Sequence, residues 1–487
     1  MRIYNTMSGK KEEFTPIDGK NVKMYACGIT VYDLSHIGHA RQAIVYRMIA
    51  DYLKYRGYNV KYVRNYTDVD DKIIKRANEI GKDALEFSRE QIVETEKDMD
   101  GLHIKDADVK TKASEYIPQI IKFTERLIEK RYAYKTPNGD VYYKVRNFKN
   151  YGMLSHRNID DLLNGVRIEN DEQKQDPLDF ALWKSAKPGE ISWESPWGAG
   201  RPGWHIECSV MALDTLGETI DIHGGGRDLV FPHHENELAQ SEACTGKPFA
   251  KYWTHCGLIK INGEKMSKSL GNSLTIRDAL SQYNYEVIKY MMIQNHYGTD
   301  LDISNSDFDL AEKHLYYFYN TMIKAKKFIN ENREKSEEAH ESPCHNDLKI
   351  KEKFIEAMDD DFGTPLATAN LYTIFKYINS LLESSKGDKA KIACEIESIL
   401  EDVKDTYRIL GLFEQEPEKY IEEVRSKHLK NMHLTLEDIR EKIAQRLEAK
   451  KNKDYALADQ IRTNLQTEGI DLRDTKEGTT WDLRELY

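Results

Sequence analysis

The sequence predicts an α/β fold, in which a parallel-sheet domain is interrupted by an inserted domain and followed by an α-helical bundle and a small C-terminal domain. Three observations support this prediction. Strand and helix patterns alternate over the first 110 residues, a stretch of different composition interrupts them, and the pattern becomes helical from residue 307. The chain has 487 residues, a length typical of roughly three domains.

The first element that we expect is a short buried strand at residues 22–27 (VKMYAC), followed by a loop at 28–35. A helix then begins at Ile37, because apolar residues recur at helical spacing, namely Ala40, Ile44, Met48 and Tyr52. Residues 58–63 (YNVKYV) form the next strand. Such a strand–helix–strand unit predicts a parallel sheet with ligands at the carboxyl ends of its strands.

Residues from about 115 to 200 break this alternation. Asn138-Gly139 lies between aromatic and β-branched runs, which indicates a hairpin. Several tryptophans follow, with Pro and Gly residues between 193 and 203. We therefore expect an insertion between two halves of the sheet domain, whose alternation resumes from 204 to about 300.

The C-terminal part is predicted to be helical, with an apolar stripe formed by Ala311, Leu315, Phe318, Met322 and Ile329. A polar stretch at 331–347 precedes a helix that Thr364 caps and Pro365 opens, and a last unit begins near Thr435. The boundaries that we expect are 1–115 and 204–305 for the halves of the sheet domain, 116–203 for the insertion, 306–425 for the bundle and 426–487 for the C-terminal domain.

Composition and charge exclude several classes of protein. No apolar run reaches the length of a membrane helix, about 18 residues, and residues 1–20 lack the apolar stretch of a signal peptide. Six cysteines are too few for a disulfide scaffold, so we expect a cytoplasmic protein without a membrane partner. The net charge of −11 disfavours a protein that coats DNA, although local basic patches can still read a particular RNA.

The segment Ser35-His36-Ile37-Gly38-His39 lies between the first strand and the first helix. A helix N-terminus offers unpaired N–H groups and a positive dipole end, which favour phosphate. His36 and His39 can donate hydrogen bonds to phosphate oxygens, and Gly38 leaves room for a planar base. The pattern therefore indicates phosphate binding, with two surface histidines near a helix cap as the alternative.

A second basic segment, Lys265-Met266-Ser267-Lys268-Ser269, follows Asn262-Gly263. Its two lysines can neutralise a polyphosphate as mobile charges, whereas the alternative is an exposed basic turn. The chain contains neither GxxxxGK[ST] nor GxGxxG, so any ATP site is of neither the P-loop nor the dinucleotide type.

These two segments resemble the HIGH and KMSKS motifs of class I aminoacyl-tRNA synthetases, and they occur in the same order. Three further segments point to one subfamily, namely residues 26–33 (ACGITVYD), 203–209 (GWHIECS) and 231–237 (FPHHENE). With them, essentially the full chain resembles a bacterial-type cysteinyl-tRNA synthetase. The resemblance implies a Rossmann-like catalytic domain with an inserted connective domain, followed by tRNA-binding regions. It also implies that the protein activates L-cysteine with ATP, transfers it to tRNA(Cys), releases AMP and pyrophosphate, and acts as a monomer.

Two further residues are spaced as metal ligands. His233 and Glu237 are four apart on a helix that Pro232 can open, so both point from one face. His234 is the local competitor, but it points about 100° away around such a helix.

Cys27 ends the first predicted strand, where the site of an α/β domain forms, and Cys208 would complete a Cys₂HisGlu set. The resemblance implies that one Zn²⁺ is held by Cys27, Cys208, His233 and Glu237. A zinc ion that binds the substrate thiolate separates cysteine from serine, because a hydroxyl is a far worse ligand.

The resemblance also assigns the remaining roles. His36, His39, Lys265 and Lys268 are expected to be catalytic. The ATP, accompanied by Mg²⁺, is expected to contact His36, Gly38, His39, Lys265, Ser267 and Lys268. Thr67 and Trp204 are expected to bind the substrate, although Trp204 also fits a core tryptophan.

Four residues of the C-terminal domain are candidates for tRNA contacts: Lys450 for a phosphate, Tyr455 for stacking, and Asp459 and Asp474 for base edges. The alternative is a basic, exposed helix with a half-buried tyrosine. The segment 72–76 (KIIKR) is linked in this family to pyridoxal phosphate, and the alternative there is a solvated helix face.

Two rival functions remain at this point. A cysteine ligase of the mycothiol pathway resembles the same catalytic half, but it lacks the full C-terminal region that this chain has. A non-catalytic RNA-binding relative with a structural zinc would have lost the motifs that are intact here.

Overall fold

The computed structural model describes residues 1–158, 173–261, 263–265, 273–332, 347–384, 387–475 and 478–486. Contacts divide the chain into two compact units. The first unit comprises Met1–Arg277, Asn295–Ile303 and Met358–Thr364. The second unit comprises Asp278–Gln294, Ser304–Ala357 and Pro365–Tyr487.

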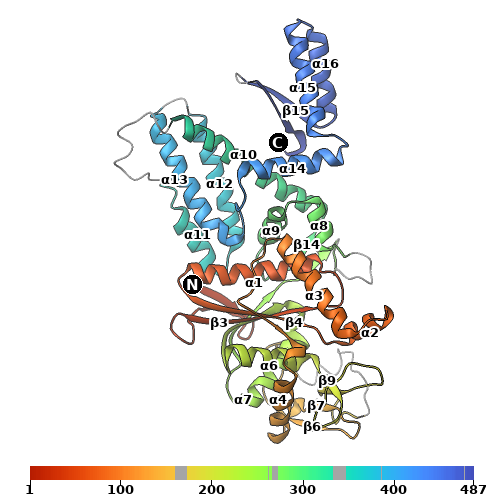
Figure 1. The fold of residues 1–487 in the computed structure, drawn as a ribbon. Coiled ribbons are helices and arrows are strands. Elements are labelled where there is room, and N and C mark those ends of the chain that lie inside the picture. The colour runs from red at the N-terminus through yellow and green to blue at the C-terminus, as the bar shows by residue number, and fades with distance from the viewer. Residues whose placement is uncertain are drawn as a thin grey trace. The chain divides into compact units, whose positions relative to one another are not determined.

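A five-stranded sheet with the order β11-β10-β3-β4-β5 forms the centre of the first unit. Every neighbouring pair is parallel. Helix α1 covers one face of this sheet and α6 covers the other (Figure 1), so the predicted α/β fold class is confirmed. These elements are β3 (Asn21–Thr30), β4 (Asn59–Thr67), β5 (Val109–Lys112), β10 (Ile220–Gly226), β11 (Ala250–Cys256), α1 (Ile37–Tyr55) and α6 (Trp204–Leu216).

The order of the strands creates a switch point beside β3. The chain runs from β3 outward to β4 and β5, and later returns on the other side of β3 as β10 and β11. In open α/β sheets, ligands bind at the carboxyl ends of the strands where the order reverses. The site is therefore expected between the ends of β3 and β10.

Strand β3 continues beyond the predicted strand at 22–27, with a bulge between Ala26 and Ile29. Gly28 lies in this bulge, and its N–H donates to Asn65 Oδ1 at 2.8 Å. A Cβ at Gly28 would lie 1.6 Å from the Asn65 carbonyl oxygen, so only glycine fits. The bulge brings the end of β3 against β4.

The insertion contains a four-stranded sheet with the order β6-β7-β8-β9, and its pairs are antiparallel. The hairpin expected at Asn138-Gly139 joins β6 to β7, with Gly139 at φ +96°. These strands are β6 (Ala133–Lys135), β7 (Val141–Tyr143), β8 (Phe180–Ser185) and β9 (Gly200–Pro202). The other described helices of the first unit are α2 (Asp71–Glu79), α3 (Ala84–Gly101), α4 (Ile117–Glu129) and α7 (Glu235–Thr245).

Small sheets complete the first unit. Strands β1 (Arg2–Asn5) and β2 (Lys10–Glu13) form a hairpin. Strand β12 (Ile259–Ile261) lies between β13 (Glu264–Lys265) and β14 (Leu301–Ile303), so the chain that leads into the KMSKS segment pairs with residues about 40 positions further on.

The second unit is largely helical, as predicted. The apolar stripe lies on α10, where Ala311, Leu315, Phe318 and Ile329 are buried and Met322 is half-buried. Thr364 begins α12, and Thr435 caps α15 through a capping box with Asp438. A β15–β16 hairpin packs beside α16.

The helices from residue 276 onward are α8 (Ile276–Gln282), α9 (Tyr285–Ile293), α10 (Asn305–Asn332), α11 (Ile350–Asp359), α12 (Thr364–Leu382), α13 (Lys389–Tyr407), α14 (Pro417–Asn431), α15 (Leu436–Lys451) and α16 (Tyr455–Thr467). The last strands are β15 (Ile470–Thr475) and β16 (Gly478–Leu483). None of the described helices is long and apolar enough to cross a membrane.

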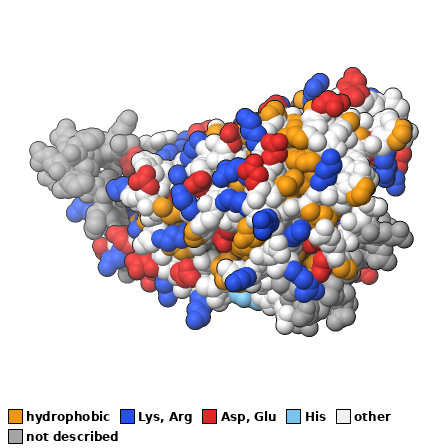
Figure 2. Space-filling model, turned by 90° about the horizontal axis from the view of Figure 1, so that it is seen from below, with side chains coloured by type: hydrophobic (Ala, Val, Ile, Leu, Met, Phe, Trp, Pro, Cys, Tyr) orange, Lys and Arg blue, Asp and Glu red, His pale blue; other side chains and the backbone are white. Residues whose placement is uncertain are grey.

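Figure 2 shows one face of the molecule, on which Lys and Arg side chains are interspersed with Asp and Glu side chains. The coloured part of this face therefore presents no continuous basic surface of the kind that binds nucleic acid by counterion release.

Candidate active site

A cavity of about 290 Å³ lies at the carboxyl ends of the central strands. Gly28 of β3, Gly226 of β10 and Cys256 of β11 all line it, so it occupies the switch point of the sheet.

The predicted phosphate-binding residues His36, Gly38 and His39 line this cavity. His36 caps α1: its Nδ1 accepts from Gly38 N at 3.1 Å, and His39 Nδ1 accepts from His36 N at 3.3 Å. Because each Nδ1 accepts, each imidazole carries its proton on Nε2. The two rings stack with centroids 3.6 Å apart, which places two N–H donors at the N-terminus of one helix.

The KMSKS segment is described only at its first residue. Lys265 ends β13, and its backbone pairs with Lys260 of β12. Ser267 and Lys268 lie outside the described residues. Ile259, the first residue of β12, lines the cavity, so the hairpin that leads into the segment starts at the site.

Arg41 holds α1 against the connection between β11 and β12. It is fully buried, and its guanidinium donates to four backbone carbonyls, those of Gly257 (3.1 Å), Leu258 (3.1 Å), His296 (3.4 Å) and Thr299 (2.7 Å). The helix that bears His36 and His39 is thereby fixed to the strand that leads into the KMSKS segment.

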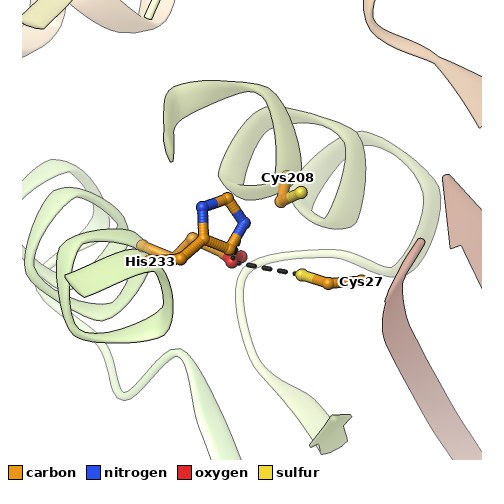
Figure 3. A group of neighbouring side chains, drawn as sticks. Cys27, Cys208 and His233 are labelled. Carbon is orange, nitrogen blue, oxygen red and sulfur yellow. Dashed lines mark hydrogen bonds and ion pairs between the residues drawn. The ribbon is translucent and has the colours of Figure 1, made fainter. Parts of the chain in front are cut away.

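Beside the cavity, the side chains of Cys27, Cys208 and His233 converge (Figure 3), and Glu237 joins them in one group. Their ligand atoms all lie within 4.8 Å of one another, and each residue is at most 2% exposed. Cys27 Sγ donates to Glu237 Oε1 at 3.2 Å, and His233 Nε2 lies 3.0 Å from the same oxygen. The four residues that the sequence selected are thus brought together from β3, α6 and the region around α7.

Burial opposes charge on every member of this cluster, and the neighbouring groups decide which members ionise. Burial lowers the pKa of His233, but the charges of Glu237 and Cys208 and the hydrogen bonds to both residues together raise that pKa to about 10. Burial raises the pKa of Cys208, but the hydrogen bond from Cys27 and the hydrogen bond and charge of His233 together lower that pKa to about 6. Burial likewise works against the Glu237 carboxylate, yet His223 and His233 hold its pKa well below the ordinary value.

This cluster fits a divalent cation. It gathers a carboxylate, a low-pKa thiol, a second thiol and an imidazole in a buried space, and these are the donor types that zinc takes in proteins.

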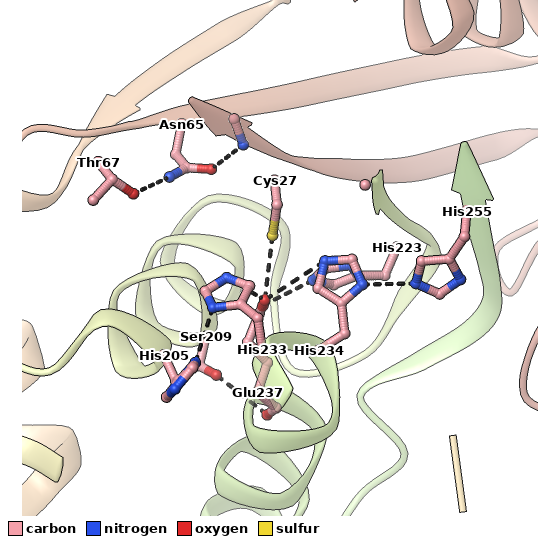
Figure 4. A network of polar contacts seen from close by, with 12 residues as sticks. Cys27, Asn65, Thr67, His205, Ser209, His223, His233, His234, Glu237 and His255 are labelled. Atoms are coloured by element: carbon pink, nitrogen blue, oxygen red, sulfur yellow. Dashed lines mark hydrogen bonds and ion pairs between the residues drawn. The ribbon is translucent and has the colours of Figure 1, made fainter. Parts of the chain in front are cut away.

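A chain of histidines surrounds the cluster (Figure 4). His233 Nδ1 lies 2.9 Å from His205 Nδ1, and Glu237 Oε2 lies 2.9 Å from His223 Nε2. His234 Nδ1 lies 2.8 Å from His255 Nε2. Sequence reasoning missed the roles of His205, His223 and His255.

Two details of the sequence prediction are wrong. Helix α7 begins at Glu235, and His233 lies in the turn Val230–His234 that precedes it, after a cis Phe231-Pro232 bond. His234 does not point away from the site: its Nε2 lies 3.9 Å from Glu237 Oε1, and it forms a second group with Cys27 and His223. An ideal helix gave the wrong direction because this turn is not α-helical.

Trp204 connects the cavity with the cluster. It lines the cavity, and its ring stacks on that of His233 with centroids 4.2 Å apart. The side chain is 36% exposed, which argues against a core tryptophan. Thr67 is buried at the end of β4, where its Oγ1 accepts from Asn65 Nδ2 at 3.4 Å.

Comparison with known proteins identifies the family. A family model described as tRNA synthetases class I (C) catalytic domain matches residues 13–313, and a DALR domain model matches residues 353–414. A cysteine–tRNA ligase of Maridesulfovibrio salexigens is 46% identical over 484 residues, which cover 99% of this chain and 100% of that protein. A cysteine–tRNA ligase of Pseudomonas fluorescens is 45% identical over 485 residues and covers 100% of both chains.

The chain belongs to the cysteine–tRNA ligase family. It is therefore an aminoacyl-tRNA synthetase, and the resemblance drawn from the motifs is confirmed. Membership in the cysteine–tRNA ligases implies tRNA, ATP and an amino acid as substrates.

Solved structures share the fold of this cysteine–tRNA ligase family member. The Mycobacterium tuberculosis methionyl-tRNA synthetase with methionyl-adenylate superposes with a TM-score of 0.61 at 14% identity, over 82% of this chain and 93% of that chain. A ternary LeuRS–tRNA–LeuAMS complex from Agrobacterium radiobacter K84 gives a TM-score of 0.58 at 11% identity, over 83% and 87% of the respective chains.

The candidate tRNA contacts of this cysteine–tRNA ligase lie in the second unit and differ in their surroundings. Asp474 accepts from Arg446 at 2.8 Å, from Lys450 at 2.7 Å and from a threonine hydroxyl. Asp459 is exposed, and Tyr455 is 62% exposed rather than half-buried. The hydrogen bond between Asp474 and Lys450 therefore stabilises the packing of α15 against the β15–β16 hairpin. The ring of Tyr455, in contrast, faces solvent.

Proposed function

We propose that this chain activates L-cysteine with ATP and transfers it to the 3′-terminal adenosine of tRNA(Cys), releasing AMP and pyrophosphate. The observation that carries the proposal is the position of Trp204, which lines the cavity of His36 and His39 and stacks on His233 of the cluster. A site that suits a nucleotide phosphate and a site that suits a thiol thus lie next to each other, with Trp204 in contact with both.

In the activation step, a carboxylate oxygen of cysteine attacks the α-phosphorus of ATP, and the bond from that phosphorus to the bridging oxygen breaks as pyrophosphate leaves. The carboxylate is already a nucleophile, so catalysis consists of alignment and charge stabilisation. His36 and His39, at the start of α1, donate hydrogen bonds from Nε2–H to the phosphate oxygens. Lys265, Ser267 and Lys268 hold the departing pyrophosphate, and Mg²⁺ accompanies the ATP.

Cys27, Cys208, His233 and Glu237 would hold one Zn²⁺, with Trp204 and Thr67 beside the substrate. When bound, zinc supplies a soft Lewis acid that prefers a thiolate to a hydroxyl, and so favours cysteine over serine. His205 and His223 orient His233 and Glu237 through the hydrogen bonds described above.

In the transfer step, a hydroxyl of the terminal ribose attacks the carbonyl carbon of the adenylate, and AMP leaves. The second unit binds the tRNA. Its candidate contacts are Lys450, Tyr455, Asp459 and Asp474. The proposed division into domains is that expected from the sequence, and the enzyme acts as a monomer in the cytoplasm.

The test is aminoacylation of a tRNA(Cys) transcript with labelled cysteine by the purified chain. We expect cysteine to be attached to this tRNA and not to a tRNA(Ser) transcript. Formation of adenylate without charging of either tRNA would contradict the proposal, because it would assign the activated cysteine to another acceptor.

A further inference from the structure

Two neighbouring residues of β3, Cys27 and Gly28, lie where the strand leaves its regular pairing. Ala26 is the last residue of β3 that pairs with β10, and pairing with β4 resumes at Ile29. The peptide groups in this bulge therefore need hydrogen-bond partners other than those of a regular sheet. The Gly28 N–H has such a partner in the side chain of Asn65.

The carbonyl group of Cys27 is held by a second side-chain amide, which comes from α1. Gln42, in the second turn of that helix, donates from Nε2 to the Cys27 carbonyl oxygen. Because a carbonyl only accepts, this contact fixes which end of the amide is the nitrogen. A Cβ at Gly226 of β10 would lie 4.0 Å from Gln42 Oε1. The amide therefore lies between the ends of β3 and β10, at the switch point of the sheet.

This contact connects the two halves of the candidate site. Cys27 directs its thiol to the metal cluster, where Sγ donates to Glu237 Oε1 at 3.2 Å, while its carbonyl accepts from α1. Gln42 lies about one helical turn after His39, and both residues line the active-site cavity. The helix that bears the phosphate-binding histidines thus also holds the strand segment that bears a candidate metal ligand.

We propose that Gln42 is a positioning residue for cysteine recognition, which holds the peptide of Cys27 so that its thiol points at the other three metal ligands; this inference rests on the proposed function. A zinc site requires its ligand atoms within about 0.2 Å of their bonding distances. Without the donor from Gln42, the carbonyl in the bulge can turn, and this rotation moves Cys27 Sγ with it. Gln42 acts through Cys27 and does not itself contact the metal.

The experiment measures the zinc affinity of the full-length chain, without ATP, by competition with a chromophoric chelator. Gln42→Met keeps the length of the side chain but removes the donor, whereas Gln42→Asn keeps the amide but is one methylene shorter. We expect both variants to bind zinc at least about fivefold more weakly than the unsubstituted chain. Their KM for cysteine in ATP–pyrophosphate exchange should rise as well. Both should remain folded, because Gln42 is only half-buried.

Tyr46 provides the matched control, because it lies on the same helix but contacts other strands. Its hydroxyl oxygen lies 2.9 Å from the Gly225 carbonyl oxygen of β10 and 2.8 Å from the Thr254 carbonyl oxygen of β11. Tyr46→Phe should therefore lower the Tm, while its zinc affinity stays within about twofold of the unsubstituted chain.

Three results would overturn this role. Zinc affinity of Gln42→Met within about twofold of the unsubstituted chain would show that the contact does not position the ligand. Equal losses of affinity in Gln42→Met and Tyr46→Phe would indicate a general effect of the packing of α1. A raised KM for ATP with unchanged zinc affinity would make Gln42 a nucleotide contact instead. Absence of zinc binding by the unsubstituted chain would refute the proposed metal site rather than the role of Gln42 alone.

Discussion

At the scale of single residues, the metal-binding proposal depends on four buried donors, and Cys208 offers the sharpest test. Replacing Cys208 by Ser exchanges a low-pKa thiol for a hydroxyl that does not ionise near neutral pH. We expect Cys208→Ser purified in zinc to retain well under half of the metal of the unsubstituted chain, measured by elemental analysis.

Cys244 provides the control for this variant, because it is equally buried but belongs to neither group of candidate ligands. Cys244→Ser should keep the full metal content. Equal metal content in the two variants would contradict the assignment of Cys208 as a ligand.

The sequence was enough to predict the four candidate metal ligands, but not the histidines that contact them, for a physical reason. Residue chemistry and the resemblance were enough to predict the four ligands. His223, in contrast, becomes a neighbour of Glu237 only when β10 pairs beside β3. No local pattern encodes such a contact between distant segments. A histidine within the buried run 220–226, just before three glycines, was the one available indication.

At the scale of secondary-structure elements, Arg41 fixes α1 by donating to four carbonyls from a fully buried position. Arg41→Met removes the guanidinium donor from the carbonyls of Gly257 and Thr299, and each buried unsatisfied group costs about 1–3 kcal/mol. The carbonyls of Leu258 and His296 keep backbone N–H donors. We expect the free energy of unfolding in urea to fall by about 3 kcal/mol or more.

Arg47 lies on the same helix but pairs with Asp51 in a partly exposed i,i+4 bridge. Arg47→Met should therefore cost about 1 kcal/mol or less. Similar losses in the two variants would contradict the view that Arg41 is the clamp of this helix.

The last helix pair and its hairpin are stabilised by Asp474. Hydrogen bonds from Arg446 and Lys450 lower the pKa of this carboxylate below its ordinary value of 3.8. Because the folded pKa is the lower one, the stabilisation is complete above pH 3.8 and is lost as the pH falls towards the folded pKa.

Asp474→Asn should accordingly weaken hydrogen-exchange protection of β15 and β16 at pH 7, by about 1 kcal/mol or less at this partly exposed pair. The difference from the unsubstituted chain, measured at equal pH by mass spectrometry, should shrink at pH 3. A difference that grows on acidification would refute this sign.

The elements themselves were largely predictable, because their determinants are local. Ile37 begins α1 as the sequence predicts, and α15 begins beside Thr435, near the predicted start of the last unit. Thr364 is the first residue of α12 rather than the cap before it. The extension of β3 through its bulge was not predictable, since it depends on the close approach of Gly28 to Asn65 of the next strand.

At the scale of the whole molecule, the proposal assigns activation to the first unit and tRNA recognition to the second. Tyr455 is 62% exposed at the start of α16, where it can stack on an unpaired base. Tyr455→Ala should lower kcat/KM for tRNA charging by about fivefold or more, corresponding to a stacking energy of about 1 kcal/mol. Cysteine-dependent exchange should be unchanged, and equal losses in both assays would contradict this division.

The central claim is that one cavity combines ATP chemistry with thiol recognition by a metal. The most direct test is ATP–pyrophosphate exchange with cysteine or serine, on zinc-loaded protein and on protein stripped by a chelator. The account predicts exchange with cysteine only, lost on stripping and restored by zinc. Exchange that persists without metal, or that serine supports equally, would contradict it.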